Sequence, residues 1–292
     1  MERLFNNRLA RVAQGAIRAA AETRLPPVVL EPAIQVYARM LSVDLEEARV
    51  PDGGFASFAE FFARRLRHDV RPVSDDRDAV VAPCDGEVVD AGEVRAGASP
   101  RMAIKGSVYG VGELLGDEDE AEDFDGGVYQ VFYLHPRDYH RVHVPADGAL
   151  ERVRHVPGTR FPVADWAERR IAGVFGRNER LVFRFETRGR PLAVVMVAAF
   201  GVGDLASPYL ATARAPRGRG AAITARELAP PARLTRGDEL GAFRLGSTVV
   251  VLGGRDAYRP VEDLVGRRVR FGGRVGTLGE ARGPRDGERE AP

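Results

Sequence analysis

Three polar residues of this chain belong to the types that act together in nucleophilic catalysis. A hydroxyl that attacks a carbonyl needs a base to accept its proton and a carboxylate to hold that base in the correct tautomer. Ser247, His143 and Asp85 are suited to these three roles, in that order. The sequence leaves open whether the hydroxyl attacks another molecule or the carbonyl of the preceding residue, Gly246.

The stretch Leu245-Gly246-Ser247-Thr248 precedes a β-branched run, Val249 to Leu252, that predicts a buried strand. A glycine carbonyl is sterically open, and glycine adopts backbone conformations closed to other residues. A strained turn could therefore press the Ser247 hydroxyl toward this carbonyl. The same composition is typical of an ordinary turn before a strand, so the stretch alone does not establish a catalytic role.

Three of the five histidines, His135, His140 and His143, lie close together in the chain. They lack a standard zinc-ligand spacing, and Cys84, the only cysteine, cannot supply a cysteine pair. We therefore predict no metal site. Each histidine taken alone is most simply explained as a structural residue.

The composition limits the classes of protein to consider. At 292 residues, with 44% apolar and 29% charged residues, the chain can form a globular protein with a sizeable core. Its net charge of +1 argues against a partner such as nucleic acid, which usually requires a strongly basic domain. No stretch approaches the roughly 18 apolar residues of a membrane span, so we expect a soluble or peripheral protein.

The N-terminal part of the sequence predicts helices. Residues 1–24 have the pattern of a basic amphipathic helix, which either packs on its own domain or lies in a membrane surface. A second helix is predicted from Pro32. Capping-box patterns predict two short helices that begin near Asp44 and near Ser57, the latter running from Phe58 to Leu66.

From Val80 onward the apolar runs are short, β-branched and separated by glycine, which indicates strands. We therefore predict an α+β fold, with N-terminal helices followed by a mainly antiparallel, sandwich-like or barrel-like β-sheet domain. The acidic segment from Asp117 to Asp125 is expected to be a solvated loop, and the tail from Gly279 to be disordered. The predicted strands are Val80–Ala82, Glu87–Ala91, Met102–Lys105, Val128–Leu134, Arg141–Val144, Ala149–His155, Leu181–Glu186, Leu192–Phe200, Ala222–Glu227, Val249–Leu252 and Arg268–Phe271.

An ordered set of motifs resembles the phosphatidylserine decarboxylases, pyruvoyl-dependent enzymes that make phosphatidylethanolamine. The set spans about residues 35 to 275, and it ends in the Leu-Gly-Ser-Thr form of the motif that resembles the bacterial and mitochondrial branch. Its blocks are Phe58-Ala59-Glu60-Phe61-Phe62-Ala63-Arg64-Arg65-Leu66 with Arg71-Pro72, Ala82-Pro83-Cys84-Asp85-Gly86, Ile104-Lys105-Gly106 with Leu114-Leu115-Gly116, Asp138-Tyr139-His140-Arg141-Val142-His143, Asn178-Glu179-Arg180 and Leu245-Gly246-Ser247-Thr248.

The resemblance implies that the chain is a zymogen that cleaves itself. Ser247 would attack the Gly246 carbonyl, and elimination and hydrolysis would leave a covalent pyruvoyl cofactor, derived from Ser247, at the start of residues 247–292. The family's triad falls on Asp85, His143 and Ser247. In the second reaction, phosphatidylserine would form a Schiff base with the pyruvoyl group and lose CO₂. His140 resembles the family histidine associated with this decarboxylation.

The resemblance also implies a domain organisation and partners. Residues 1–72 would form a helical membrane-association region, residues 73–278 the decarboxylase domain, and residues 279–292 a disordered tail. The fragments 1–246 and 247–292 would stay together as a heterodimer, which could assemble further as a homo-oligomer. The protein would sit on an anionic membrane surface at the cytoplasmic face of the inner membrane. By charge alone, Arg141, Lys105 and Arg180 are candidates for binding the lipid phosphate.

Two alternatives remain at the level of sequence. A serine hydrolase could use Asp85, His143 and Ser247 on another molecule. A non-catalytic β-rich binding module is the other alternative, because the C-terminal part from Val261 to Leu278 resembles half of a lipoyl- or biotinyl-type hammerhead. The lack of a lysine at a hairpin tip argues against a carrier function for that part.

Overall fold

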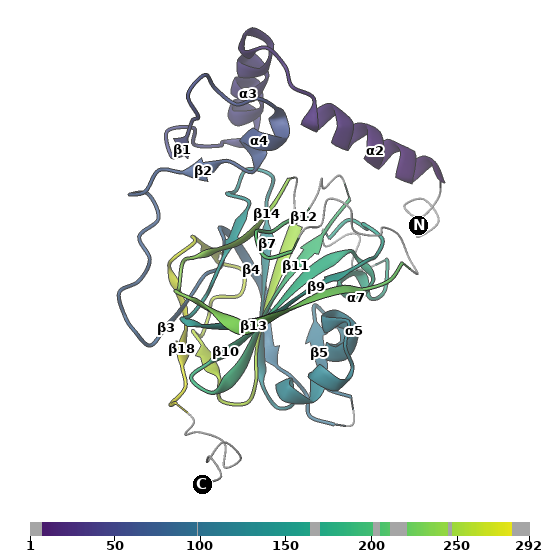
Figure 1. Ribbon diagram of the computed structural model, residues 1–292, viewed down its shortest axis with the longest axis vertical. Helices are drawn as coiled ribbons and strands as arrows, with labels where there is room; N and C mark the ends of the chain where they lie inside the picture. Colours follow the sequence, from purple (N-terminus) through teal and green to yellow (C-terminus); the bar gives the residue numbers. More distant parts are fainter. Residues whose placement is uncertain are drawn as a thin grey trace.

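The computed structural model describes residues 8–97, 99–163, 170–200, 205–210, 221–244 and 247–281 of the chain. The N-terminal helices lie above one end of a larger body made mostly of antiparallel strands (Figure 1). The predicted α+β class is confirmed. The predicted partition at residues 72 and 278 stays a prediction, and residues 282–292 of the expected disordered tail lie outside the described residues.

Two longer helices open the described chain. α2 (Arg8–Glu22) forms within the predicted amphipathic segment, whose residues 1–7 are not described. α3 (Pro27–Leu41) begins at Pro27 and not at Pro32, which lies inside the helix. Pro27 suits the first turn because the first N–H groups of a helix have no partner within the helix.

The Ser57 half of the predicted capping box is formed, whereas the Glu60 carboxylate binds the N–H one residue before the one that a capping box requires. The Ser57 hydroxyl accepts from the Glu60 N–H at 3.2 Å, and the Glu60 carboxylate accepts from the Ala56 N–H at 2.6 Å. These bonds satisfy N–H groups at the start of α4 (Phe58–Phe62), which ends four residues before the predicted end at Leu66.

The prediction of a short helix that begins near Asp44 is wrong. The Asp44 carboxylate accepts from the Glu46 N–H at 2.9 Å in a turn, and the Glu47 carboxylate that a capping box would use is bound by an arginine instead. The chain continues as β1 (Ala48–Arg49), which pairs with β2 (Arg65–Leu66).

An eight-stranded antiparallel sheet forms the centre of the molecule, in the order β13-β9-β10-β11-β15-β7-β4-β17. The sheet is open, with β13 and β17 at its edges, so the barrel-like alternative is wrong. β15, which contains the predicted strand Val249–Leu252, lies between β11 and β7. The strands are β4 (Gly86–Glu93), β7 (Val128–Leu134), β9 (Gly148–Val156), β10 (Arg180–Thr187), β11 (Arg190–Ala198), β13 (Thr224–Leu234), β15 (Ser247–Gly253) and β17 (Arg268–Val269).

Smaller sheets and short helices complete the body. Every predicted strand overlaps an observed one, whereas several short strands with glycine or polar residues were not predicted. The small sheets are β12 (Leu205–Ala206), β14 (Glu239–Phe243) and β8 (Arg141–His143); β16 (Tyr258–Pro260), β18 (Arg274–Leu278) and β3 (Ala79–Val81); and β5 (Arg101–Ile104) with β6 (Ser107–Gly110). The short helices are α5 (Val111–Leu115), η1 (Asp119–Phe124) and α7 (Val174–Arg177).

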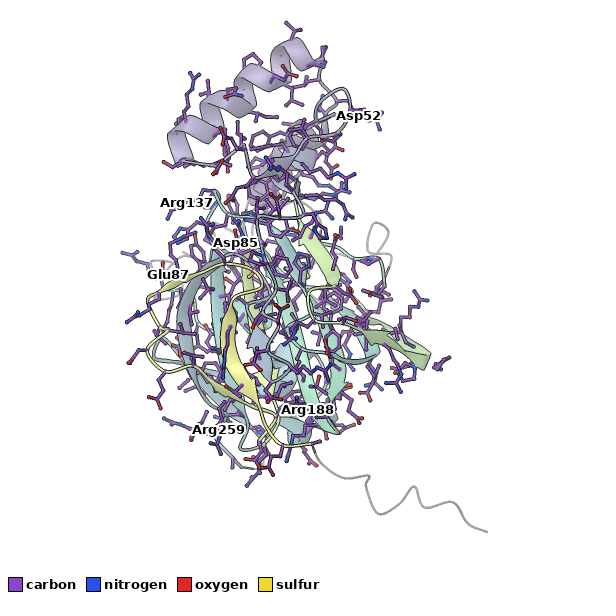
Figure 2. All side chains as sticks on the ribbon, turned by 90° about the vertical axis from the view of Figure 1, so that its left-hand side faces the viewer. Asp52, Asp85, Glu87, Arg137, Arg188 and Arg259 are labelled. Atoms are coloured by element: carbon purple, nitrogen blue, oxygen red, sulfur yellow. The ribbon has the colours of Figure 1, made fainter. Side chains whose placement is uncertain are left out.

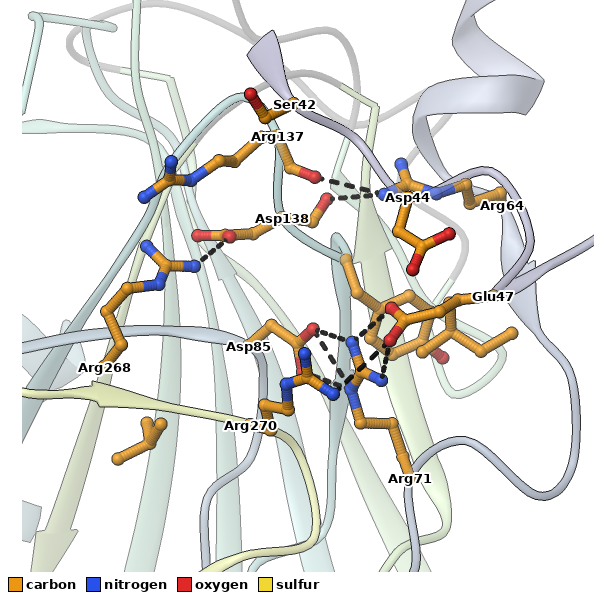
Figure 3. A pocket seen from close by; sticks show the side chains of 13 residues that line it. Ser42, Asp44, Glu47, Arg64, Arg71, Asp85, Arg137, Asp138, Arg268 and Arg270 are labelled. Atoms are coloured by element: carbon orange, nitrogen blue, oxygen red, sulfur yellow. Dashed lines mark hydrogen bonds and ion pairs between the residues drawn. The ribbon is translucent and has the colours of Figure 1, made fainter. Parts of the chain in front are cut away.

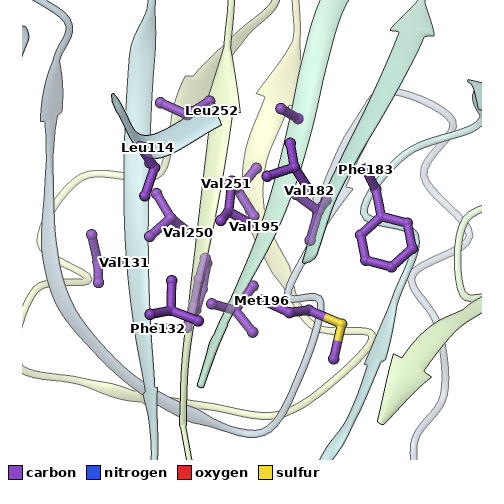
Figure 4. Packing of buried hydrophobic residues seen from close by; sticks show 14 of the residues in the cluster. Leu114, Val131, Phe132, Val182, Phe183, Val195, Met196, Val250, Val251 and Leu252 are labelled. Atoms are coloured by element: carbon purple, nitrogen blue, oxygen red, sulfur yellow. The ribbon is translucent and has the colours of Figure 1, made fainter. Parts of the chain in front are cut away.

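The main core lies on the central sheet, where apolar side chains of neighbouring strands pack together (Figure 4). Val131, Val195 and Val250 are fully buried and come from the adjacent strands β7, β11 and β15. Burying one such side chain stabilises the fold by roughly 1.5–3 kcal/mol. β15 is thus held rigidly along its length, which fixes the position of the residue at its start.

The acidic segment is not the solvated loop predicted from its charge. It forms the 3-10 helix η1, anchored by the buried Phe124. Arg154 of β9 binds Asp117 at 2.8 Å and Glu120 at 2.9 Å, so an arginine of the sheet neutralises these two carboxylates. The charge pattern missed this because the compensating cations come from a distant strand.

Candidate active site

The strand that carries His143 lies beside the strand that leads to Ser247. β8 pairs with β14, and the Phe243 N–H at the end of β14 donates to the His140 carbonyl oxygen at 2.9 Å. Ser247 is the first residue of β15. Residues 245–246 and the side chain of Ser247 lie outside the described residues. The topology thus brings both histidines to the end of the β body at which β15 begins.

Asp85 reaches this region through the turn Pro83-Cys84-Asp85-Gly86, the first of two Pro-x-Asp-Gly turns in the chain. The His143 N–H donates to the Pro83 carbonyl oxygen of that turn at 2.8 Å. The second turn, Pro145-Ala146-Asp147-Gly148, is bound to β3 just before the first, because the Val81 N–H donates to the Pro145 carbonyl oxygen at 2.9 Å. The two turns, far apart in the sequence, therefore hold Asp85 and His143 in the same part of the molecule.

The Asp85 carboxylate is buried in an ion-pair cluster. It accepts from the Arg71 guanidinium at 2.6 Å and from the Phe271 backbone N–H at 2.8 Å. Arg71 also binds Glu47 at 2.7 Å, so one guanidinium joins two carboxylates (Figure 3). These interactions lower the pKa of Glu47 and raise the pKa of Arg71 against the opposing effect of burial.

His143 has partners at both ring nitrogens. Nδ1 is 2.8 Å from the Gly237 carbonyl oxygen, which can only accept, so Nδ1 carries the proton. Nε2 is then an acceptor, and the Tyr139 hydroxyl donates to it at 2.9 Å. The ring stacks on Phe271, with centroids 3.8 Å apart. Burial lowers the pKa of His143 to about 4, so the ring is neutral at neutral pH and its Nε2 lone pair can act as a base.

The structure therefore departs from the simple triad in one respect. The Gly237 carbonyl, and not Asp85, accepts the bond from His143 Nδ1. Asp85 is linked to His143 through Phe271, which donates its N–H to the carboxylate and stacks its ring on the imidazole. Tyr139, His143 and Gly237 also line a cavity of about 930 Å³, which gives water access to this face of the base.

His140 is fully buried, and its two ring nitrogens differ in their partners among the described residues. Its Nδ1 donates to the Asp138 carbonyl oxygen at 2.8 Å, and the ring packs on Phe62 with centroids 4.1 Å apart. Nε2 has no hydrogen-bond partner among the described residues. Burial lowers the pKa of His140 to about 3, so the ring is neutral and Nε2 offers an unused lone pair.

The third nearby histidine does not join these two. His135 Nε2 lies 3.4 Å from a Glu87 carboxylate oxygen, on β4. Within the part of the chain that the structure describes, no group of three or more His, Cys, Asp or Glu residues is arranged to hold a metal ion.

Two of the three basic residues that are candidates for binding the lipid phosphate are engaged elsewhere. Arg180 is buried and donates to the carbonyl oxygens of Leu114, Gly176 and Asn178, which is a structural role. Arg141 donates to the Ala63 carbonyl oxygen and pairs with Glu239. Lys105 lies in the turn between β5 and β6.

Several site residues were not assigned a role from the sequence. Arg71 and Tyr139 stand inside the motif blocks quoted above, so the blocks were a signal for them. Gly237 and Phe271 approach His143 from distant parts of the chain and belong to no local pattern.

Comparison with known proteins shows the family of the chain. The family model for phosphatidylserine decarboxylase matches residues 58–277, which include all the predicted site residues. A phosphatidylserine decarboxylase proenzyme from Shewanella halifaxensis is 37% identical over 237 residues, covering 80% of this chain and 82% of that protein. Proteins of the same name from Anaeromyxobacter sp. strain K and Azotobacter vinelandii are 40% and 39% identical, over 81% and 82% of this chain and 83% and 84% of their own lengths.

The chain belongs to the phosphatidylserine decarboxylase family. Decarboxylase chemistry is thereby favoured over the serine hydrolase and the non-catalytic module. Both alternatives lack support in these comparisons.

Proposed function

We propose that this chain is a phosphatidylserine decarboxylase that makes its own pyruvoyl cofactor by cleavage between Gly246 and Ser247. The observation that carries the proposal is the family match over residues 58–277, a range that contains Asp85, His140, His143 and the cleavage motif. The proenzyme names of the relatives fit a chain that is activated by processing.

The residues around Ser247 suit a pyruvoyl group at this position. Ser247 is the first residue of the central strand β15, so a group at a new N-terminus there would be held by a rigid sheet. His140 contributes a buried ring nitrogen that has no partner in the described part of the chain, which suits a polar group bound beside it. The pyruvoyl carbonyl would supply an electron-accepting group for loss of CO₂ from an amino acid headgroup.

Self-cleavage uses His143 as the base. The Ser247 hydroxyl gives its proton to His143 Nε2 and attacks the Gly246 carbonyl, which converts the amide to an ester. Elimination from this ester and hydrolysis then release ammonia. The Tyr139 hydroxyl, which occupies Nε2, must move away first. The Gly237 carbonyl keeps the proton on Nδ1 and so holds the ring in the tautomer that the reaction needs.

Asp85 supports the base from a distance, with Arg71 and the Phe271 N–H fixing its carboxylate. Its negative charge stabilises the imidazolium that forms when His143 takes the proton. His140 acts in the second reaction, where its neutral Nε2 can accept a hydrogen bond or a proton in a site that excludes water.

We also propose that the helical region binds the cytoplasmic face of the inner membrane. α2 and α3 expose several large apolar side chains. Exposure of so many apolar side chains to water on one small region is unfavourable, and a membrane surface would remove this exposure. No described helix is long and apolar enough to cross a membrane. The cleaved fragments stay associated, because β15 of the small fragment pairs with β11 and β7 of the large one. The exposed side chains are Val12, Ile17, Val28, Val29, Val36 and Met40.

Mass spectrometry of the purified full chain tests the cleavage. We expect fragments 1–246 and 247–292, with the smaller one blocked to Edman sequencing and carrying a carbonyl. Ser247→Ala should give an intact chain. Processed protein should release CO₂ from phosphatidylserine and form phosphatidylethanolamine, and an active preparation made only of intact chains would refute the proposal.

Flotation with anionic liposomes tests the membrane role. A variant that lacks residues 1–24 should bind these vesicles more weakly than the full chain. Undiminished binding would show that this helix does not carry the association.

A further inference from the structure

A cavity of about 540 Å³ lies between the helical layer and the β body, next to the site described above. Figure 3 shows that arginines from the end of α4, from the turn after β7 and from the β17 segment point into this region together with carboxylates. Most of these charges neutralise one another. Asp85 and Glu47 are bound by Arg71, and Asp138 is bound by Arg268.

Arg64 is the exception among the buried cations of this cavity. Arg64 is only 5% exposed. Its Nη2 donates to the carbonyl oxygens of Arg137 and Asp138 at 3.2 and 3.3 Å. Its Nε and Nη1 have no hydrogen-bond partner among the described residues. Burial lowers the pKa of Arg64, which reflects the cost of keeping this charge away from water.

A buried guanidinium with unused donors is costly unless an anion completes it. The nearest carboxylates do not serve, because their own arginines bind them. The Phe61 ring, whose centroid is 5.3 Å from the Arg64 guanidinium carbon, offsets only part of the cost. The arrangement is therefore suited to an anion that arrives from outside the chain.

A second arginine at the same cavity is available to such an anion. Arg137 is exposed, and in the described part of the chain its guanidinium has no acidic partner. It lies directly below the helical layer, on the side proposed to face the membrane (Figure 2). Asp44 also lines the cavity and would repel an anion, so the two arginines must outweigh this one carboxylate.

We infer that Arg64 and Arg137 form a subsite for the phosphodiester of the phosphatidylserine headgroup. The inference rests on the proposed function. Arg64 Nη2 and His140 Nδ1 donate to the same oxygen atom, the Asp138 carbonyl, so the guanidinium adjoins the histidine proposed for decarboxylation. Guanidinium groups bind phosphate through charge-assisted, often bidentate hydrogen bonds, so two of them can hold the headgroup while its amine reaches the reacting position.

Steady-state decarboxylation of short-chain phosphatidylserine by the processed enzyme tests the subsite. Arg137→Gln should raise KM about tenfold at nearly unchanged kcat, since it removes one charge-assisted contact. Arg64→Met should raise KM further, and Arg64→Lys should recover part of the loss. Arg259→Gln, an exposed arginine at the other end of the β body, is the matched control and should behave as wild type.

Inorganic phosphate serves as the probe of the site in wild type and in Arg137→Gln. Competitive inhibition that weakens in Arg137→Gln supports the subsite. Inhibition that lowers kcat without changing KM would mean that phosphate and substrate bind together. The arginines would then bind another anion, such as a neighbouring lipid headgroup or free phosphate, and the assignment would be overturned. An unchanged KM in Arg137→Gln would also overturn it, even if Arg64→Met failed to fold. Self-cleavage and wild-type decarboxylation are measured in parallel, so failure of the proposed function is seen separately.

Discussion

His140 and His143 are three residues apart, yet the fold gives their rings different chemical states. Both are buried, and both hold Nδ1 on a backbone carbonyl oxygen, of Asp138 for His140 and of Gly237 for His143. They differ at Nε2. The Tyr139 hydroxyl occupies the Nε2 of His143, whereas the Nε2 of His140 has no partner among the described residues.

This difference separates the two proposed reactions within one short segment. A base that already holds a hydrogen bond must release it to act, which suits a reaction that each chain performs once. A ring nitrogen left without a partner carries an energetic cost that a bound group can remove, which suits repeated binding of substrate. Two histidines with the same backbone anchor can thus serve successive steps without competing for the same group.

Replacing either of the two histidines by alanine should have the largest effects. His143→Ala should slow self-cleavage roughly 10²–10⁴-fold, because it removes the general base. His140→Ala should leave self-cleavage close to wild type and reduce decarboxylation by a similar factor of roughly 10²–10⁴. Gel analysis of fragment formation and CO₂ release measure the two reactions separately.

Refolding yield and thermal melting of both variants provide the control, since each substitution also leaves a cavity in a buried site. If His140→Ala blocked cleavage while it remained folded, the division of labour between the two rings would be wrong.

The region around His143 should also lose stability in acid. Its pKa and that of His140 are lowered by burial to about 4 and about 3, so between pH 6.5 and these values the unfolded chain binds protons that the folded chain does not. The free energy of unfolding should therefore fall as the pH drops, by about 1.4 kcal/mol per pH unit for each histidine.

Urea unfolding of processing-deficient Ser247→Ala at pH 7, 6 and 5 measures this slope. Adding His143→Gln should reduce the slope, and His68→Gln, at an exposed position, should leave it unchanged. Equal slopes in all three proteins would contradict the assignment of acid sensitivity to the buried ring.

The cluster beside His143 allows a matched pair of substitutions on one arginine. Arg71 binds both Asp85 and Glu47, but only Asp85 also accepts the N–H of Phe271, which stacks on His143. Asp85→Asn should slow self-cleavage about tenfold, because it removes a negative charge that stabilises the imidazolium by about 1.4 kcal/mol. Glu47→Gln should change the rate less than twofold. Cleavage of Asp85→Asn at the wild-type rate would remove Asp85 from the reaction.

Local patterns were sufficient for the parts of the fold that local chemistry determines. The β-branched runs predicted the strands of the central sheet, and the capping box at Ser57 predicted the start of α4. The pattern at Asp44 failed because a long-range ion pair, from Glu47 to Arg71, competes with the local cap. The prediction for the acidic segment from Asp117 to Asp125 was wrong for the same reason, because Arg154 of β9 supplies the compensating positive charge.

The site shows the same limit. Residue types and the ordered motifs predicted Asp85, His140, His143 and Ser247, but they could not predict which atom each ring nitrogen faces. The partner of His143 Nδ1 is a backbone carbonyl, and every residue carries one, so no side-chain pattern singles out Gly237. Hydrogen bonds to the backbone follow from the packing of distant turns, which the sequence does not display.

The smallest effect is expected at the hydroxyl that distinguishes the two rings. In Tyr139→Phe, the Nε2 of His143 loses its partner and comes to resemble that of His140. A neutral hydrogen bond contributes about 1 kcal/mol, so self-cleavage should be up to about fivefold faster if the hydroxyl must leave before the base can act. Stacking on Phe271 and the bond to Gly237 should keep the ring in place. The rate of fragment formation in freshly refolded protein measures this, with Tyr209→Phe as a control at a tyrosine outside this contact. Slower cleavage in Tyr139→Phe would mean that the hydroxyl assists the proton transfer, and the contrast between an occupied and a free ring nitrogen would then need a different explanation.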